Sequence, residues 1–172
     1  LAGEMDRGTM DLVATLPISR GRIYASHSLL ILAMGLVMCW GVWVGVAIGR
    51  GILGVKDVRL DLLVRVTWNL YAVFVLIASF SLAISAMTSR RGPAVAAAFF
   101  LVFYAFILNV LRAIWPALDV VAWTDFLYYY QSMRIVWDEA YRWKDFAVLL
   151  SLAAAWWVAG YIAFSRRDIP AR

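Results

Sequence analysis

Four long stretches of the chain contain no Asp, Glu, Lys or Arg and are almost wholly apolar. Each is about 20 residues or longer, which is enough for a helix to cross roughly 30 Å of hydrocarbon. Their apolar residues are continuous rather than alternating with a period of two, which favours helices over the strands of a closed barrel. The pattern predicts an all-α integral membrane protein with four transmembrane helices. The predicted spans are residues 23–49, 66–89, 92–115 and 146–165.

The composition supports a membrane as the solvent. The chain is 65% hydrophobic and 15% aromatic, with a mean hydropathy of +0.80, whereas a soluble domain is nearer half apolar. A small fold cannot hide such an excess inside itself, because much of its surface stays outside the core. The net charge of +5 would suit anionic lipid or a nucleic acid. The hydropathy favours membrane lipid, and no nucleic-acid partner is predicted.

The segments between the spans give an orientation. An even number of spans places both ends of the chain on one side of the membrane. Arginines precede the first span, lie between the second and third, and follow the fourth. The positive-inside rule makes this side the cytoplasm, so the C-terminus is predicted to be cytoplasmic. The basic residues of segment 50–65 lie on the opposite side and argue against it.

Residues 116–145 form the longest segment between spans and are rich in Trp and Tyr. Amphipathic rings of this kind favour the headgroup layer. We therefore expect an outer interfacial loop with one or two short helices. Its rings would form either an aromatic belt or a vestibule that contacts a substrate.

Several chemical signatures are missing from the sequence. It has no phosphate-binding Gly-x-x-x-x-Gly-Lys-Ser/Thr loop and no His-Glu-x-x-His motif. Its one histidine, His27, and its one cysteine, Cys39, are interpreted as packing residues. No catalytic, cofactor-binding or metal-binding residue is predicted. The spans also lack ionisable groups at mid-membrane, and Arg112 near the end of the third is expected to snorkel to the interface.

A series of glycines marks the first span. Gly41, Gly45 and Gly49 follow one another at intervals of four residues. This spacing lets two helix backbones approach closely. It predicts a helix-packing site, either within the chain or across a dimer.

The first 22 residues are amphipathic and charged, unlike the rest of the chain. An apolar face recurs at helical spacing through Thr9, Leu12 and Leu16. Pro17 would end this helix, and the side-chain oxygen of Ser19 would cap the next one. The segment predicts a cytoplasmic helix and a sharp elbow into the first span. Such a helix could lie on the lipid or dock a cytosolic partner.

Several motifs together resemble the ABC-2 type permeases. The stretch "GEMDRGTMDLVATLPISRGRI" resembles the segment after the second membrane helix of that family, with its acidic residue, Arg-Gly-Thr and Leu-Pro-x-Ser-Arg. "SAMTSRRGPAVA" is similar to its inner loop between helices four and five. "FILNVLRAIWPALDVV" and "DFLYYYQ" resemble its outer region, and "FSRRDIPA" its tail. Each motif alone is weak, but they occur in the family's order over nearly the whole chain.

The resemblance implies a fold and a role. The family has six membrane helices, so the four spans would be helices three to six, and Leu1 would follow a missing segment. The chain would be a non-catalytic permease subunit of an exporter in the plasma membrane, the inner membrane of a bacterium or archaeon. It would pair with a second permease copy, in a homo- or heterodimer. Cytosolic ABC ATPase subunits would bind and hydrolyse the ATP-Mg.

The same resemblance makes the amphipathic segment the coupling helix of the permease. The residues implied in contact with the ATPase or in the elbow are Arg7, Thr9, Met10, Leu12, Val13, Leu16, Pro17 and Ser19. Two other functions are considered. A membrane anchor or assembly protein without transport could recruit a cytosolic partner through the same helix. A membrane enzyme is disfavoured, because the spans lack carboxylates and the chain is poor in His and Cys.

Overall fold

The computed structural model describes residues 19–54, 59–88, 90–130, 132–137 and 141–166. Within these ranges all regular structure is helical. Four of the helices are long and apolar enough to cross a membrane, which confirms the predicted all-α membrane fold. The long helices are α3 (Arg20–Leu53), α4 (Leu60–Met87), α5 (Arg91–Ile114) and α7 (Trp143–Arg166). The short ones are η1 (Pro116–Thr124), η2 (Phe126–Tyr128) and α6 (Ser132–Trp137).

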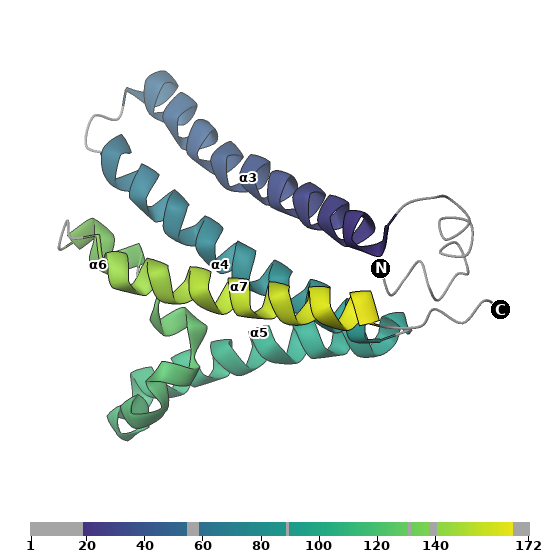
Figure 1. The fold of residues 1–172 in the computed structure, drawn as a ribbon. Helices are drawn as coiled ribbons and strands as arrows, with labels where there is room; N and C mark the ends of the chain where they lie inside the picture. The colour runs from purple at the N-terminus through teal and green to yellow at the C-terminus, as the bar shows by residue number, and fades with distance from the viewer. Residues whose placement is uncertain (1–18, 55–58, 89, 131, 138–140, 167–172) are drawn as a thin grey trace.

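The four long helices run back and forth between two ends of the molecule (Figure 1). At one end α3 begins, α4 ends, α5 begins and α7 ends; we name this the Arg20 end. At the opposite end of the molecule, α3 ends and α4 begins, and η1, η2 and α6 lead from α5 into the start of α7. We name this the Arg65 end. Charged side chains of the long helices lie within a few turns of these two ends.

Local signals explain where α3 stops. Gly54 follows it with φ 65°, the left-handed conformation that commonly terminates helices and that glycine adopts without steric cost. The 34 residues of α3 give it a length of about 51 Å. This exceeds the roughly 30 Å of bilayer hydrocarbon, so α3 tilts in the membrane or extends beyond it.

Helix α4 lies at the centre of the bundle. In its most apolar window 44% of the residues are buried inside the structure, against 11% in α3 and 17% in α5 and α7. It contacts α3, α5, α6 and α7, most extensively α7. The other helices expose large apolar side chains over much of their length. Lipid tails would solvate these surfaces, since water would not.

The core is formed mainly between α4 and α7. Ala72, Val73 and Leu76 of α4 pack with Leu149 and Ala153 of α7. Towards the Arg20 end the two helices approach closely, because Gly160 has no side chain to hold Ala83 away. Small residues at a contact between membrane helices allow this close approach.

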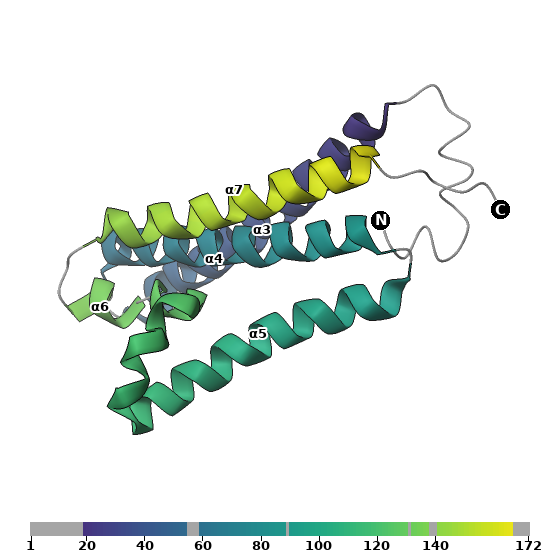
Figure 2. The same ribbon diagram turned by 60° about the horizontal axis from the view of Figure 1, so that its bottom comes forward.

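Helix α5 diverges from the other three towards the Arg65 end (Figure 2). Its buried residues are Ala94, Ala105 and Leu108, and much of its aromatic face is exposed. Between α5 and the rest lie η1 and η2, and Phe126 of η2 is buried in the core beside α4 and α7. The sequence predicts an interfacial loop for residues 116–145; the structure inserts this part of it between the helices.

Candidate functional site

Most of the predicted coupling residues lie outside the described residues. These are Arg7, Thr9, Met10, Leu12, Val13, Leu16 and Pro17. Ser19 is described, and it occupies the N-cap position of α3 with an extended backbone. Its carbonyl accepts hydrogen bonds from the N–H groups of Arg22 and Ile23 at 2.9 and 3.3 Å. The predicted side-chain cap is wrong, because the Ser19 side chain makes no such bond; Ser19 is exposed, and water can serve the free N–H groups.

The predicted glycine site faces away from the described helices. A Cβ built on Gly41, Gly45 or Gly49 would meet no described atom within 4 Å. The described part of the chain therefore contains no helix packed on this series, and contact with a second copy stays a prediction. The most closely packed described glycines are instead Gly35, against Phe74, and Gly160, against Tyr24 and Ala83.

A polar link ties α3 to α7 near the Arg20 end. The hydroxyl of buried Tyr24 donates to the carbonyl oxygen of Trp157 at 3.1 Å. The Trp157 indole N–H in turn donates to Oγ of Ser28 at 2.8 Å. The Ser28 hydroxyl donates to the Tyr24 carbonyl, also at 2.8 Å. This ring of contacts satisfies polar groups that would be costly to leave unpaired in lipid.

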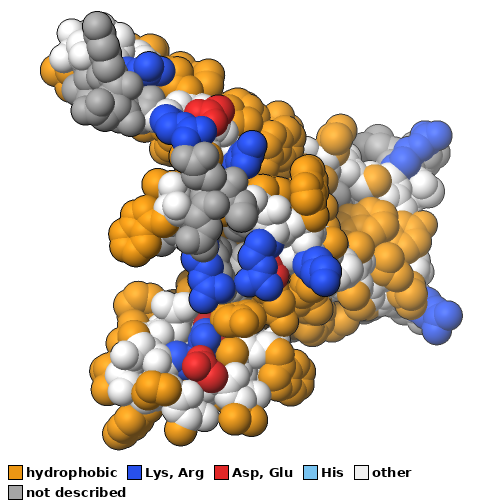
Figure 3. Space-filling view, turned by 90° about the vertical axis from the view of Figure 1, so that its left-hand side faces the viewer, with side chains coloured by type: hydrophobic (Ala, Val, Ile, Leu, Met, Phe, Trp, Pro, Cys, Tyr) orange, Lys and Arg blue, Asp and Glu red, His pale blue; other side chains and the backbone are white. Residues whose placement is uncertain are grey.

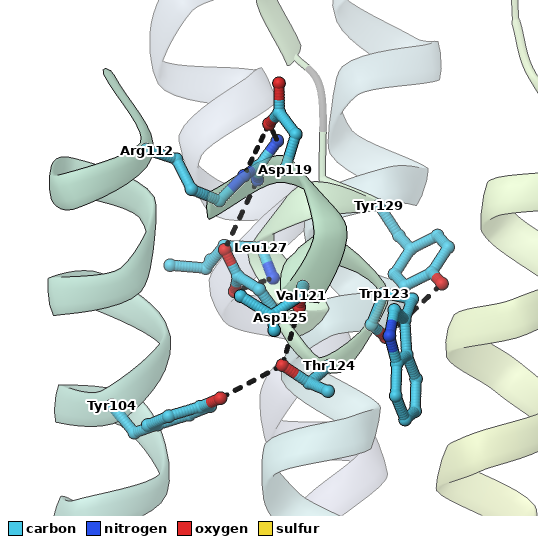
Figure 4. A network of polar contacts seen from close by, with 9 residues as sticks. All are labelled: Tyr104, Arg112, Asp119, Val121, Trp123, Thr124, Asp125, Leu127 and Tyr129. Carbon is cyan, nitrogen blue, oxygen red and sulfur yellow. Dashed lines mark hydrogen bonds and ion pairs between the residues drawn. The ribbon is translucent and has the colours of Figure 1, made fainter. Parts of the chain in front are cut away.

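A second polar cluster joins the end of α5 to η1 and η2 (Figure 4). Arg112 donates from Nε and Nη2 to Oδ1 of Asp119 at 3.0 and 2.9 Å. Its Nη1 lies 3.9 Å from Oδ2 of Asp125. Its guanidinium carbon lies 4.8 Å from the centre of the Tyr128 ring, within cation–π range. The Arg112 side chain is only 14% exposed and is held by acidic partners in the chain; its expected snorkelling to the interface stays a prediction.

Asp125 is the buried carboxylate of this cluster and is 0% exposed. Its Oδ1 accepts the Leu127 N–H at 2.8 Å, while Oδ2 has no hydrogen-bond partner among the described residues. Burial raises the pKa of this carboxyl, and the Leu127 hydrogen bond and the charge of Arg112 oppose the rise. The cluster therefore depends on one arginine for charge compensation.

A neutral contact anchors the same loop to α5. The hydroxyls of Tyr104 and Thr124 lie 3.0 Å apart, and Thr124 also donates to the Val121 carbonyl at 2.8 Å. Together with Arg112, these contacts hold η1 and η2 against the otherwise diverging end of α5. The arrangement positions a segment of chain at the Arg65 end; it does not bring a nucleophile and a base together. Sequence reasoning missed it, although the acidic residues that follow Arg112 were a usable signal.

Among the described residues there is no group of three or more His, Cys, Asp or Glu side chains able to hold a metal ion. The fold and these contacts define the class of the protein. It is a helical multi-pass membrane protein whose charges gather at the two ends of its helices and whose polar contacts join helices to one another.

The comparison with known families identifies it more closely. The model of the ABC-2 family transporter proteins matches residues 1–169, so the chain belongs to this family of transporter membrane proteins. This confirms the resemblance and makes the chain a transport permease. No curated protein and no solved structure matches the chain.

Proposed function

We propose that the chain is the permease subunit of an ATP-driven exporter, and that it forms the translocation pathway while a separate cytosolic ABC ATPase hydrolyses ATP. The observation that carries this proposal is the family match, which runs from residue 1 through the amphipathic segment and all four long helices to residue 169. ABC-2 permeases transport; the exporter direction and the coupling to an ATPase are the steps proposed here.

The distribution of charge supports an outside source of energy. In the described parts of the four helices, Asp, Glu, Lys and Arg occur only within a few turns of either end. Ion-coupled transporters place ionisable groups within the membrane despite the high cost of doing so. Helices without such groups offer no charged side chain to bind a coupling ion at mid-membrane. Energy would therefore enter by contact with another protein.

Residues 1–22 are proposed as the segment through which this energy enters the permease. Thr9, Leu12 and Leu16 share one face of the predicted amphipathic helix, which would seat in the ATPase. Such coupling requires that this contact differ in free energy between two states of the transporter. The start of α3 lies directly after the elbow, so movement of the docked helix would pass to α3 and, through Tyr24 and Trp157, to α7.

A second permease copy is proposed as the partner that completes the pathway. The glycine series of α3 supports this, since it presents a surface without side chains to the outside of the described bundle. Small residues of this spacing permit close packing of another membrane helix.

The orientation is proposed with the Arg20 end in the cytoplasm. By their place in the sequence, the sixteen Lys and Arg residues divide evenly between the two ends, so the positive-inside rule does not choose. The proposal rests on residues 1–22, which must meet a cytosolic ATPase and precede the start of α3 at this end. Single cysteines placed at Ser19 and Lys144 would test it: a membrane-impermeant maleimide added to intact cells should label the second and spare the first.

The coupling proposal is tested by substitutions in the full-length protein expressed with its ATPase. Thr9→Arg and Leu12→Asp should each lower co-purification of the ATPase, because a charge enters the apolar docking face. Asp11→Asn, on another face of the same predicted helix, is the matched control and should leave binding unchanged. Undiminished binding by both variants would contradict the proposal.

A second measurement separates transport from anchoring. In proteoliposomes, the wild-type complex should hydrolyse ATP faster when a substrate is present, and Leu12→Asp should abolish this increase. An ATPase that binds in the wild-type manner but never responds to any substrate would instead favour the membrane-anchor function.

A further inference from the structure

A cavity lies where α3, α4 and α7 meet. Its volume is about 260 Å³. Ser28 and Trp157, which close the polar link between α3 and α7, lie at one side of it. Most of its lining is apolar, and small side chains leave the space open. The small and apolar residues contributed by α4 and α7 are Val75, Ala78, Leu82, Leu150, Ala153 and Ala154.

A second cavity, of about 530 Å³, lies nearer the Arg65 end between the start of α4 and the start of α7. Its lining differs from that of the first, since it combines one cation with four aromatic rings: Arg65, Trp68, Tyr141, Trp143 and Phe146. Three of these rings pack on one another, with the Tyr141 and Trp143 ring centres 4.8 Å apart. The walls of this cavity are therefore a preformed aromatic cluster.

The two cavities lie along one face of the bundle. On α4, Arg65 and Trp68 of the second cavity are followed at helical spacing by Val75 and Ser79 of the first. On α7, Phe146 of the second cavity is followed by Leu150, Ala154 and Trp157 of the first. Residues three, four or seven positions apart share a helix face. We name this face, from Arg65 to Trp157, the lipid groove.

We propose that the lipid groove binds a single phospholipid with an anionic headgroup, its phosphate on Arg65 and one acyl chain lying along the outside of the α4–α7 contact towards Trp157. This site is independent of the proposed transport function, because it requires neither the ATPase nor a transported substrate.

The dimensions of the groove fit an acyl chain. Eleven residues separate Phe146 from Trp157 on α7, which corresponds to about 16 Å along a helix axis. One leaflet of the bilayer contributes about 15 Å of hydrocarbon, half of the roughly 30 Å core. A chain that enters beside Phe146 would therefore end near Trp157. There the contact between Tyr24 and Trp157 closes the space between α3 and α7.

The chemistry at the mouth of the groove fits a phosphate headgroup. Trp and Tyr rings prefer the headgroup layer of a membrane. The planar guanidinium of arginine matches a phosphate with two parallel hydrogen bonds. Arg65 also interacts within the chain, and its five N–H donors let it serve a phosphate as well.

The charge around the mouth favours an anion. Figure 3 shows Lys and Arg side chains gathered across the Arg65 end, with hydrophobic side chains beside them. Among the described residues, the acidic side chains of Asp61 and Asp145 at the starts of α4 and α7 are each paired with another arginine, Arg59 at 2.9 Å and Arg142 at 3.3 Å. A zwitterionic lipid would bind here less tightly than an anionic one, because these Lys and Arg side chains would repel the cation of its headgroup.

Photo-crosslinking tests the proposal on the full-length protein in phosphatidylcholine nanodiscs. The probe is phosphatidylglycerol with a diazirine midway along one acyl chain. Mass spectrometry should place the crosslinks mainly on α4 and α7 near Val75, Leu150 and Ala154. Unlabelled phosphatidylglycerol should compete, whereas phosphatidylcholine and free glycerol 3-phosphate should not. Competition by glycerol 3-phosphate would overturn the chain-binding part of the proposal.

Two variants test the headgroup and the groove separately. Arg65→Gln should lower this crosslinking about tenfold, the loss expected for one charge-assisted phosphate contact. Arg59→Gln, which removes another cation from the same end, is its control and should change little. Ala154→Phe should fill the groove and lower crosslinking with Arg65 intact, while Leu152→Phe, at another exposed position of α7, should not.

Other outcomes would overturn the proposal. Crosslinks spread evenly over the exposed apolar faces of α3 and α5, and insensitive to both Arg65→Gln and Ala154→Phe, would show general lipid contact only. Size-exclusion chromatography of each variant checks that it is folded. If Arg65→Gln fails to fold, Ala154→Phe still decides whether the groove is occupied.

Discussion

The Tyr24 hydroxyl lies 3.1 Å from the carbonyl oxygen of Trp157, and this hydrogen bond joins α3 to α7 across 133 positions of sequence. The two rings also pack together, with centres 5.7 Å apart. Tyr24 lies in the first turns of α3, shortly after residues 1–22 of the proposed coupling segment and elbow. Trp157 lies at the closed end of the lipid groove. Their contact is therefore the point where the proposed coupling helix and the bundle core are connected.

Removing this hydroxyl should weaken the α3–α7 contact. Tyr24→Phe keeps the ring but removes the donor that α3 supplies to the Trp157 carbonyl. We expect a loss of about 0.6 kcal/mol, the average for a hydrogen bond between membrane helices. Unfolding in mixed micelles with increasing SDS measures it. Tyr161→Phe is the control, because its hydroxyl makes no hydrogen bond in the described residues; an equal loss there would show that the effect does not come from the hydrogen bond between Tyr24 and Trp157.

Glycine positions should differ sharply in their tolerance of a methyl group. Gly160→Ala places a Cβ 2.7 Å from Cα of Ala83 and against the Tyr24 hydroxyl. Overpacking of this kind costs about 1–3 kcal/mol of unfolding free energy, which the same SDS titration would detect. Gly45→Ala meets no described atom and should leave the stability of the monomer unchanged or slightly raised.

The same Gly45→Ala variant bears on the dimer. If a second copy packs on the glycine series, this variant should weaken self-association in a crosslinking or energy-transfer assay while the monomer stays stable. Unaltered association would show that α3 pairs through another face or that this face contacts lipid.

Arg112 should matter far more than an exposed arginine. Arg112→Ala leaves Asp125 buried without a counter-charge, and breaking such a pair costs about 3–5 kcal/mol. Arg59→Ala removes the cation of a pair whose side chains are 50% and 58% exposed, so water screens the pair and its loss should have a much smaller effect. Limited proteolysis between α5 and α7 gives a local readout. Equal sensitivity of the two variants would show that the Arg112 cluster does not hold the loop.

Asp125 should make the stability of this loop depend on pH. Burial raises its pKa in the folded chain above the ordinary 3.8, so the folded state binds this proton more tightly than the unfolded state does. The resulting stabilisation is fully present below pH 3.8 and is lost as the pH rises through the folded-state pKa. Asp125→Asn should remove this part of the pH dependence in unfolding titrations. An unchanged profile would exclude Asp125 as its source.

Much of the fold could be predicted from the sequence, and little of the site. The four spans follow from uncharged apolar runs, because the cost of a charge in hydrocarbon is a property of the residue itself. Arg112 shows the limit of this reasoning. Its position near a helix end indicates snorkelling, yet the chain after it folds back and brings Asp119 and Asp125 to the guanidinium. The hydrophobic periodicity of a sequence does not predict a contact that forms because the chain turns back irregularly.

The glycines show the same limit in another way. The regular series from Gly41 to Gly49 suggested packing, whereas the most closely packed glycines in the described structure are Gly35 and Gly160. The spacing of glycines indicates where another helix could pack closely on the backbone. Only the direction of each helix decides where another backbone arrives.

The sequence by itself determined that this protein lies in a membrane, which four of its described helices are long and apolar enough to cross it, and to which family it belongs. Those properties depend on the type and order of the residues along the chain and not on contacts between distant segments. The tertiary structure alone decided that α4 is central, that Arg112 is paired, and that Arg65 and Trp157 each line a cavity beside α4 and α7. These depend on distances between segments far apart in sequence, and the shapes of the packed helices set those distances.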